Sequence, residues 1–196
     1  MNINNTISIS NLLQKTEARC DGYRFNHIQM DDLKDLAKWP KFKDKKLSWA
    51  NFTATTIALQ ERWYQNSVKP RVAWMAIRSD NAERSLIGRC SVSQPDTGSD
   101  LIFGIVLRPD ITGKGVGTKV IKAIIRYLFE RTSYEGIWLE SHIENQIARK
   151  VWEKIGFQFI SYHYRRAVSG NMDKFAAYRF TREKMQTLPE VEIIEL

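Results

Sequence analysis

The chain has 196 residues, 43% of them hydrophobic and 27% charged, and it carries a formal net charge of +8. This size and composition are ordinary for a single globular domain with one sizeable core, and no apolar run approaches the roughly 18 residues of a membrane-spanning helix. The first residues lack the basic start and apolar core of a secretory signal. The 2 cysteines and 3 scattered histidines form neither a disulfide framework nor a metal-site spacing. We therefore expect a cytoplasmic protein that holds no metal.

The positive charge is spread along the chain rather than gathered in one arm. It is densest at 38–46, 114–131, 149–154 and 165–182, and no zinc-finger spacing or RNA-recognition motif accompanies it. We expect no specific nucleic-acid binding and no membrane partner. The charge suits a polyanionic cofactor, proximity to ribosomal RNA, or simply a basic protein surface, and the sequence leaves these three readings open.

The first half of the chain predicts a strand, two helices and a pair of strands. Residues 1–18 are polar and asparagine-rich, which is typical of an arm or of a frayed first element. Asp31 and Asp32 open a short helix that Pro40 ends. The expected elements are a strand at 23–28, helices at 31–38 and 55–67, and strands at 71–77 and 86–93.

A glycine-rich turn between a strand and a helix is the most informative feature of the second half. The buried strand at 102–107 is followed by Gly113, Gly115 and Gly117, and then by apolar residues at a helical spacing: Val116, Val120, Ile124 and Leu128. Glycines let an anion approach the main chain, and the start of a helix offers free N–H groups and positive potential. The turn does not match a nucleotide-hydrolysing P-loop. It indicates a phosphate site, although a glycine-rich connection can also serve purely steric needs.

A second motif follows at a short distance. Residues 137–139 read as a short buried strand, and Asn145 is a good N-cap. The helix after it places one apolar face inward and ends at Gly156; that face comprises Ile147, Ala148, Val151, Trp152 and Ile155.

The glycine turn, followed by Asn145-x-x-Ala148 and by Glu153-Lys154-x-Gly156-Phe157, resembles the GCN5-related N-acetyltransferase (GNAT) superfamily. The resemblance covers residues 23–183. Within it, the pattern Trp138-Leu139-Glu140 with Asn145 is similar to the Rim-type enzymes, which acetylate the N-termini of ribosomal proteins.

The predicted element order and this resemblance together imply an α+β fold. We expect a mixed, mostly antiparallel sheet of six to seven strands flanked by about four helices. The expected organisation is a polar arm at 1–18, a single domain at 19–185 and a C-terminal segment at 186–196. This last segment follows Pro189 and is assigned as a tail, with an added edge strand as the open alternative.

The activity implied by the resemblance is acetyl transfer from acetyl-CoA to a primary amine. The acceptor expected first is a protein or peptide N-terminus, with ribosome proximity as a possible partner relation, in a monomer or a homodimer. A small amine (an aminoglycoside, a polyamine or an amino sugar) is the alternative acceptor. A non-catalytic acetyl-CoA-binding module is the alternative of a different class.

The resemblance also assigns residues to acetyl-CoA. Main-chain groups of Ile105, Val106 and Leu107 would contact the pantetheine arm, and Asn145 would combine that contact with helix capping. The pyrophosphate would lie against the turn and the first helical residues, namely Thr112, Gly113, Lys114, Gly115, Val116, Gly117 and Thr118. Thr112 stands where many members of the family carry Gln or Arg.

Glu140 is the candidate general base, because the similar branch places its catalytic glutamate at this position. Asp100 and His142 are the reserve candidates. Trp152 occupies the place where many relatives carry a proton-donating tyrosine, and an indole is not an acid at neutral pH. Possible substitutes for that acid are Tyr162, Tyr164 and Tyr178. The acceptor is expected to contact residues from 39–52 and 162–173.

Overall fold

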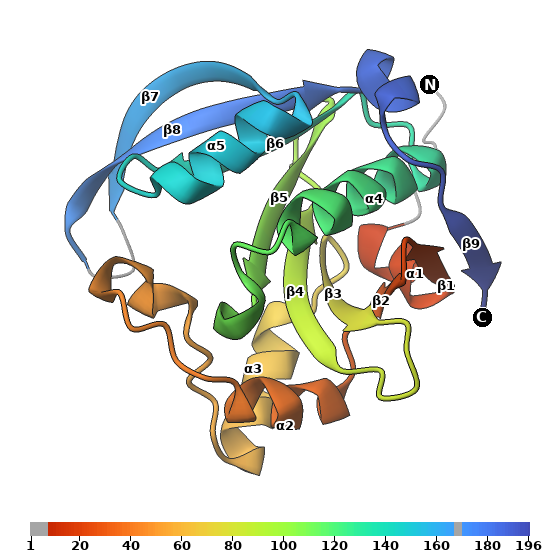
Figure 1. Ribbon diagram of the computed structural model, residues 1–196, viewed down its shortest axis with the longest axis vertical. Helices are drawn as coiled ribbons and strands as arrows, with labels where there is room; N and C mark the ends of the chain where they lie inside the picture. Colours follow the sequence, from red (N-terminus) through yellow and green to blue (C-terminus); the bar gives the residue numbers. More distant parts are fainter. Residues whose placement is uncertain (1–7, 167–169) are drawn as a thin grey trace.

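The computed structural model describes residues 8–166 and 170–196 of the chain. One sheet runs through the molecule in the order β7-β8-β6-β5-β4-β3-β2-β1-β9 (Figure 1). Every neighbouring pair is antiparallel except β5 and β6. The strands are β1 (Thr16–Cys20), β2 (Tyr23–His27), β3 (Val72–Ser79), β4 (Leu86–Ser93), β5 (Asp100–Leu107), β6 (Gly136–His142), β7 (Gln158–Arg166), β8 (Met172–Thr181) and β9 (Glu192–Glu195).

Five α-helices and three short 3-10 helices accompany the sheet in these described residues. The α-helices are α1 (Ile9–Gln14), α2 (Met30–Lys38), α3 (Ile57–Ser67), α4 (Val116–Arg131) and α5 (Gln146–Ile155). The 3-10 helices are η1 (Lys45–Ala50), η2 (Pro109–Ile111) and η3 (Arg182–Thr187). None of the described helices is long and apolar enough to cross a membrane.

The sheet separates two hydrophobic clusters, and β3 shows how. Successive side chains of a strand point to opposite faces. Met75 and Ile77 therefore pack in the larger cluster with residues of α1, α4 and α5, whereas Ala76 packs in the smaller cluster with residues of α2. Trp74 and the α3 residue Trp63 pack against the smaller cluster. The sheet thus has an α4 face and an α2/α3 face.

On the α4 face, the structure confirms the two helices that the sequence predicts, except that Ile147, expected on the buried face of α5, is 76% exposed. Val120, Ile124 and Leu128 of α4 are fully buried, as the helical spacing indicates. The Asn145 side chain accepts a hydrogen bond from the Ala148 N–H at 3.2 Å and so caps α5. The helix α5 ends at a glycine in the left-handed region, with φ at 112°.

The sheet has nine strands within the described residues, more than the six to seven expected, because both terminal segments add strands. Of the expected arm, residues 1–7 lie outside the description. The remainder forms α1, whose Ile9 and Leu13 are buried, and most of β1. In the segment assigned as a tail, β9 pairs with β1, for example Ile193 with Ala18. The structure therefore places an edge strand, not a free tail, at 192–195.

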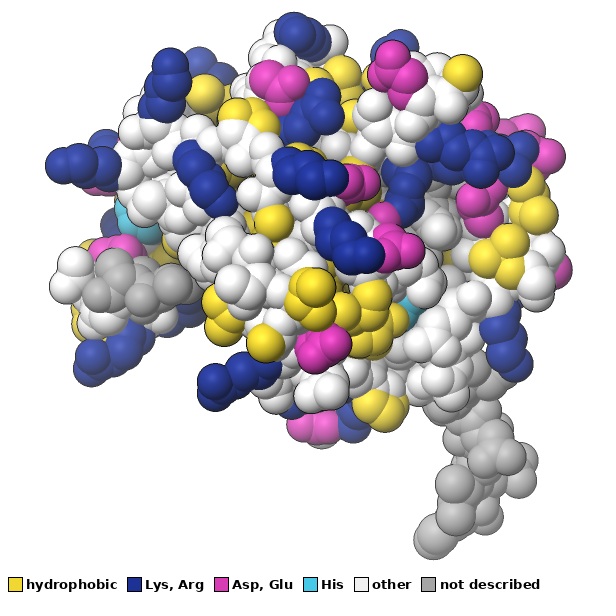
Figure 2. Space-filling view, turned by 90° about the horizontal axis from the view of Figure 1, so that it is seen from below, with side chains coloured by type: hydrophobic (Ala, Val, Ile, Leu, Met, Phe, Trp, Pro, Cys, Tyr) yellow, Lys and Arg dark blue, Asp and Glu magenta, His cyan; other side chains and the backbone are white. Residues whose placement is uncertain are grey.

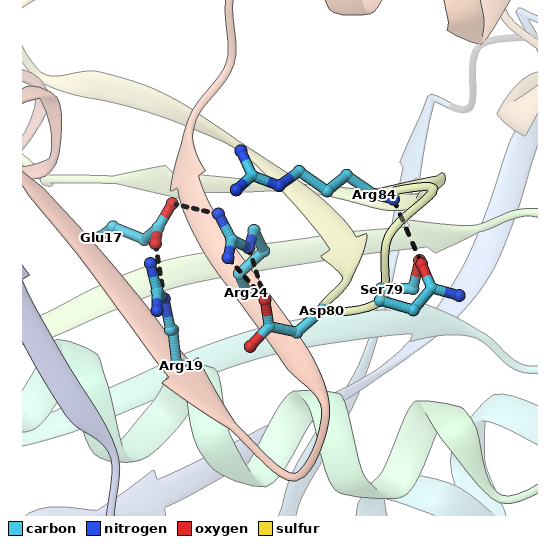
Figure 3. A network of polar contacts seen from close by, with 7 residues as sticks. Glu17, Arg19, Arg24, Ser79, Asp80 and Arg84 are labelled. Carbon is cyan, nitrogen blue, oxygen red and sulfur yellow. Dashed lines mark hydrogen bonds and ion pairs between the residues drawn. The ribbon is translucent and has the colours of Figure 1, made fainter.

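An ion-pair network holds β1 in register with its neighbours (Figure 3). Glu17 on β1 accepts from Arg19 at 2.8 Å and lies 3.5 Å from Arg24 of β2. Arg24 in turn binds Asp80, which follows β3, at 2.5 Å. Because Glu17 and Arg24 are both at least nine-tenths buried, their charges need these partners.

Candidate active site

The strands β5 and β6 separate after a short parallel stretch. Their register covers Asp100↔Gly136, Leu101↔Ile137 and Ile102↔Trp138. Beyond that point the residues of β5 pair with β4 alone, and the residues of β6 pair with β8 alone. In the described structure this opens a wedge between the two strands, where main-chain groups of β5 have no strand partner. Ile105, Val106 and Leu107, the residues expected to contact the pantetheine arm, all lie on this open stretch.

The glycine turn lies between the end of β5 and the start of α4. Gly113 and Gly115 adopt φ values of 79° and 78°, which favour glycine, and a Cβ at either would meet no atom within 4 Å. Gly115 is the N-cap residue of α4, so the first N–H groups of a long helix face this open space. Lys114, Val116 and Thr118 belong to the same turn and first helical residues. The space and the donors fit a phosphate group.

Gly117 has a different role from the other two glycines. It is helical, and a Cβ at this position would lie 3.2 Å from Leu107 Cδ1. The absence of a side chain therefore lets the first turn of α4 approach β5 closely. Thr112 is engaged locally, since its hydroxyl donates to the Pro109 carbonyl at 2.8 Å. In Asn145 the side-chain oxygen is used for capping, which leaves the amide NH2 for a ligand.

Glu140 projects from β6 onto the α2/α3 face, where it joins two basic residues of β7. Its Oε2 lies 2.7 Å from His163 Nε2, and its Oε1 accepts a hydrogen bond from Arg165 Nε. The Arg165 guanidinium lies 3.9 Å from the centre of the Phe175 ring, and the His163 ring stacks on the same ring at 6.1 Å. We call these residues the Glu140 cluster; it consists of Glu140, His163, Arg165 and Phe175. Glu140 itself lies on β6, the strand that borders the wedge.

The sequence analysis included His163 and Arg165 only as part of the 162–173 acceptor region. His163 and Arg165 are two positions apart on one strand, and this spacing is the sequence signal that predicts a shared face. The partner across the sheet could not be read from the sequence, because β8 lies between β7 and β6 and sets the register.

The two reserve candidates for the base are engaged elsewhere. Asp100 makes a two-pronged ion pair with Arg179, at 2.6 and 2.8 Å. His142 accepts a hydrogen bond from the Glu144 N–H at its Nδ1, and its Nε2 lies 3.5 Å from Asp173. Both ring nitrogens of His142 therefore have protein partners, as both carboxylate oxygens of Glu140 do. Asp100 lies where β5 and β6 are still paired, outside the wedge.

The residues weighed as a general acid also have structural surroundings. Trp152 is 7% exposed and packs on Phe157 in the larger cluster. Tyr178 is fully buried, and its hydroxyl is held by Arg149 at 3.0 Å and by Glu153 at 3.3 Å. Tyr162 and Tyr164 are exposed on the edge strand β7. The described structure brings none of these side chains to the Glu140 cluster by a direct contact.

The expected acceptor region at 39–52 approaches the C-terminal end of β6, where Glu140 also lies. Lys46 of η1 binds Glu144, which follows β6, at 2.7 Å. The ion pair raises the pKa of Lys46 and lowers the pKa of Glu144. Figure 1 shows this orange segment below the curved β7–β8 hairpin. Seen from the α2 and α3 end, Lys and Arg side chains are scattered among acidic ones and do not form one stripe (Figure 2).

Among the residues that the structure describes, no group of three or more His, Cys, Asp or Glu is placed to hold a metal ion.

Comparisons with known proteins bear on the family and the fold. A family model described as an acetyltransferase (GNAT) domain matches residues 24–158. A search of curated proteins found no match. Among solved structures, a chimera of the spermidine N-acetyltransferase SpeG from Vibrio cholerae and hSSAT is similar with a TM-score of 0.67 and 16% identity, over 85% of this chain and 99% of that one.

Two further solved structures give the same fold. A GNAT-family acetyltransferase from Bacillus anthracis has a TM-score of 0.69 and 14% identity, over 85% of this chain and 99% of its own. A GCN5-related N-acetyltransferase from Brucella melitensis has a TM-score of 0.69 and 18% identity, over 87% and 84%. These relatives do not single out the Rim-type group. The family model spans well over half of the sequence, and the chain therefore belongs to the acetyltransferase (GNAT) domain family, whose members are acyltransferases that use acetyl-CoA.

Proposed function

We propose that the protein transfers the acetyl group of acetyl-CoA to the primary amine of a small molecule, in the wedge between β5 and β6. The observation that carries this proposal is the position of the wedge. An open anion cradle at Gly113 and Gly115 adjoins one of its strands, and the Glu140 cluster lies on the other. A donor with a phosphate-bearing tail and an amine acceptor can therefore approach the same opening.

The residues that would hold acetyl-CoA follow from the geometry above. The N–H groups of 113–118 suit the pyrophosphate, and the unpaired main chain of Ile105, Val106 and Leu107 suits the pantetheine arm. The Asn145 amide NH2 adds a donor at the start of α5. Bound there, acetyl-CoA supplies a thioester whose C–S bond breaks as the new C–N bond forms, with the thiolate leaving.

The chain itself must orient the thioester oxygen and accept a proton. A main-chain N–H on the open stretch of β5 can stabilise negative charge on that oxygen. The proton lost by the amine goes to the Glu140 cluster, with the Glu140 carboxylate as the first candidate. His163 and Arg165 position this carboxylate through its two oxygens. No side chain is assigned to protonate the thiolate.

A small amine is the acceptor class that the comparisons favour, because a spermidine acetyltransferase is among the similar structures. A peptide N-terminus is the second candidate, which the Trp138-Leu139-Glu140 and Asn145 pattern supports. Within small amines, the charges of the site do not favour a polycation, because Glu140 and Glu144 already have cationic partners in Arg165 and Lys46.

The test is to incubate the purified protein with acetyl-CoA and a panel of amines, and to measure thiol release and acetylated product. The panel contains alkylamines, amino acids, amino sugars, an aminoglycoside, spermidine and short peptides with free N-termini. Turnover of one or more small amines is expected. Turnover of peptides alone would replace the first acceptor class by the second. Coenzyme A binding with no product from any member would contradict the assignment of acetyl transfer to amines.

A further inference from the structure

A buried arginine on the α2/α3 face has no carboxylate partner. Arg89 on β4 is 8% exposed, and no Asp or Glu in the described part of the chain lies within ion-pair distance of it. Its Nη2 donates to the Ala50 carbonyl at 3.4 Å, which is a long hydrogen bond. Its Nε is enclosed and has no hydrogen-bond partner. Buried charges are normally paired, and this guanidinium has no anionic partner among the described residues.

A second donor without a partner lies against the first. The guanidinium carbon of Arg89 is 5.2 Å from the ring centre of Trp74 and 5.8 Å from that of Phe52. The Nε1 of Trp74 is itself enclosed without a hydrogen-bond partner. Packing on aromatic rings accounts for the position of the Arg89 guanidinium. It does not account for the neighbouring Trp74 N–H, which has no acceptor among the described residues. Two adjacent donors without acceptors call for an oxygen-rich, negatively charged group.

This pair lies on the same face of the sheet as the Glu140 cluster. Arg89 is paired with Val106 of β5. Ile105 and Leu107, on either side of Val106, pack toward α4, so Val106 and Arg89 point to the α2/α3 face. The parallel partner of Ile102 is Trp138, so Glu140, two residues further along β6, shares the face of Arg89. Neighbouring strands are about 4.8 Å apart. Where β5 and β6 are still paired, the backbones of β4 and β6 are therefore on the order of 10 Å apart, and this distance increases along the wedge.

We propose that Arg89 and Trp74 form a subsite for an anionic group of the acceptor, so that the preferred substrates are small amines that also carry a carboxylate or a phosphate. This inference rests on the proposed function and narrows it. An arginine binds either group through a planar fork of donors. The amine would lie at the wedge near Glu140, and the anion would lie toward Arg89, at a separation that a short aliphatic chain spans.

The test compares acceptors that differ only in the anionic group. The matched pairs are 6-aminohexanoate with hexylamine, 4-aminobutyrate with butylamine, and phosphoethanolamine with ethylamine; the last pair distinguishes phosphate from carboxylate. We expect the anionic member of at least one pair to have the higher kcat/KM by about 10- to 100-fold, the range for a hydrogen bond to a charged group. Equal kcat/KM within every pair would overturn the inference, while turnover of the alkylamines would leave the proposed function standing.

Two substitutions link the preference to these residues. Arg89→Met removes the charge at similar volume and should bring the ratio within each pair close to 1, whereas Arg89→Lys should retain part of the preference. Trp74→Phe removes the Nε1 donor together with part of the ring that packs on Arg89, and should reduce the ratio by a smaller factor. A preference that persists in both Arg89→Met and Trp74→Phe would contradict the subsite. Coenzyme A affinity serves as the check that each variant is folded.

A binding measurement keeps the inference testable if none of these amines is turned over. Calorimetric titration of the coenzyme A complex with 6-aminohexanoate and with phosphoethanolamine should show binding to the wild-type protein and none to Arg89→Met. Absence of binding to the wild type, or equal binding to both proteins, would exclude the subsite independently of catalysis.

Discussion

Replacing Arg89 by methionine should make the protein more stable, although it removes a charged residue that makes contacts. Burial lowers the pKa of Arg89 from its ordinary value to about 10. At about 1.4 kcal/mol per pH unit, this corresponds to a cost of roughly 3 kcal/mol for keeping the guanidinium charged in the fold. The folded-state pKa lies below the unfolded one, so the cost is fully present at pH 7 and disappears only as the pH rises above about 10.

The contacts that the substitution removes offset part of this gain. Cation–π contacts with Phe52 and Trp74 contribute roughly 1 to 2 kcal/mol, and the long hydrogen bond to Ala50 contributes less than about 1 kcal/mol. The expected net effect of Arg89→Met is a free energy of unfolding that is higher by about 1 kcal/mol, since a buried unpaired charge can be replaced by an apolar side chain without loss.

Urea denaturation at pH 7 measures this effect, provided that the m-values of the two proteins agree. Arg179→Met is the matched control, because Arg179 is paired with Asp100 through two hydrogen bonds. That variant leaves a partly buried carboxylate alone and should be less stable than the wild type by about 1 kcal/mol. If Arg89→Met lost more than about 1 kcal/mol instead, Arg89 would be a structural residue and the reasoning from its missing partner would fail.

Three further outcomes are expected. Gly115→Val should weaken coenzyme A binding at least about tenfold in a calorimetric titration, because a β-branched residue resists the positive φ of this position. Gly98→Val is the control, because Gly98 also has a positive φ, of 102°, and lies in a turn remote from the cradle. Glu140→Gln should lower kcat by roughly 10²–10⁴-fold, with partial recovery at alkaline pH, where the amine is already neutral. A pH–rate profile equal to that of the wild type would exclude Glu140 as the base. Glu130→Gln is the control. Burial lowers the pKa of His27 more than a backbone hydrogen bond with Ile28 raises it. The free energy of unfolding should therefore fall by up to about 1.4 kcal/mol per pH unit below about pH 6.5, and equal acid sensitivity in His27→Leu would refute this.

The helices α2 to α5 could be predicted, with their approximate boundaries, because their signals are local, whereas α1 lies in the segment that was assigned as an arm. The spacing of Val120, Ile124 and Leu128 follows the turn of one helix, and the cap at Asn145 acts on a residue three positions away. The glycine turn is equally local, since the positive φ of Gly115 is a property of a single residue. These short-range features also define the cradle expected to bind the phosphates.

What the sequence did not predict depends on contacts between distant segments. Strand β9 is short and exposed, and it exists because Ile193 and its neighbours find an open edge at β1, which is far away in the chain. His163 meets Glu140 only because β8 fixes the register of both strands. Arg89 is missed for a related reason, since a basic residue in a strand is ordinarily assigned to the solvent face. Its burial follows from Phe52 and Trp74, which come from two other segments.

The charges around the wedge bear on the choice of amine. A polyamine carries several positive charges and requires carboxylates that are not already neutralised. In this protein Glu140 is held by Arg165 and His163, and Asp100 is held by Arg179. Among the described residues of this face, a buried charge without an ion-pair partner is a cation, Arg89. The electrostatic balance is thus the reverse of a polycation site, and likeness in fold to a spermidine acetyltransferase does not require the same acceptor. An acceptor with one amine and one anionic group would suit both the Glu140 cluster, where we propose that the proton is accepted, and the guanidinium of Arg89.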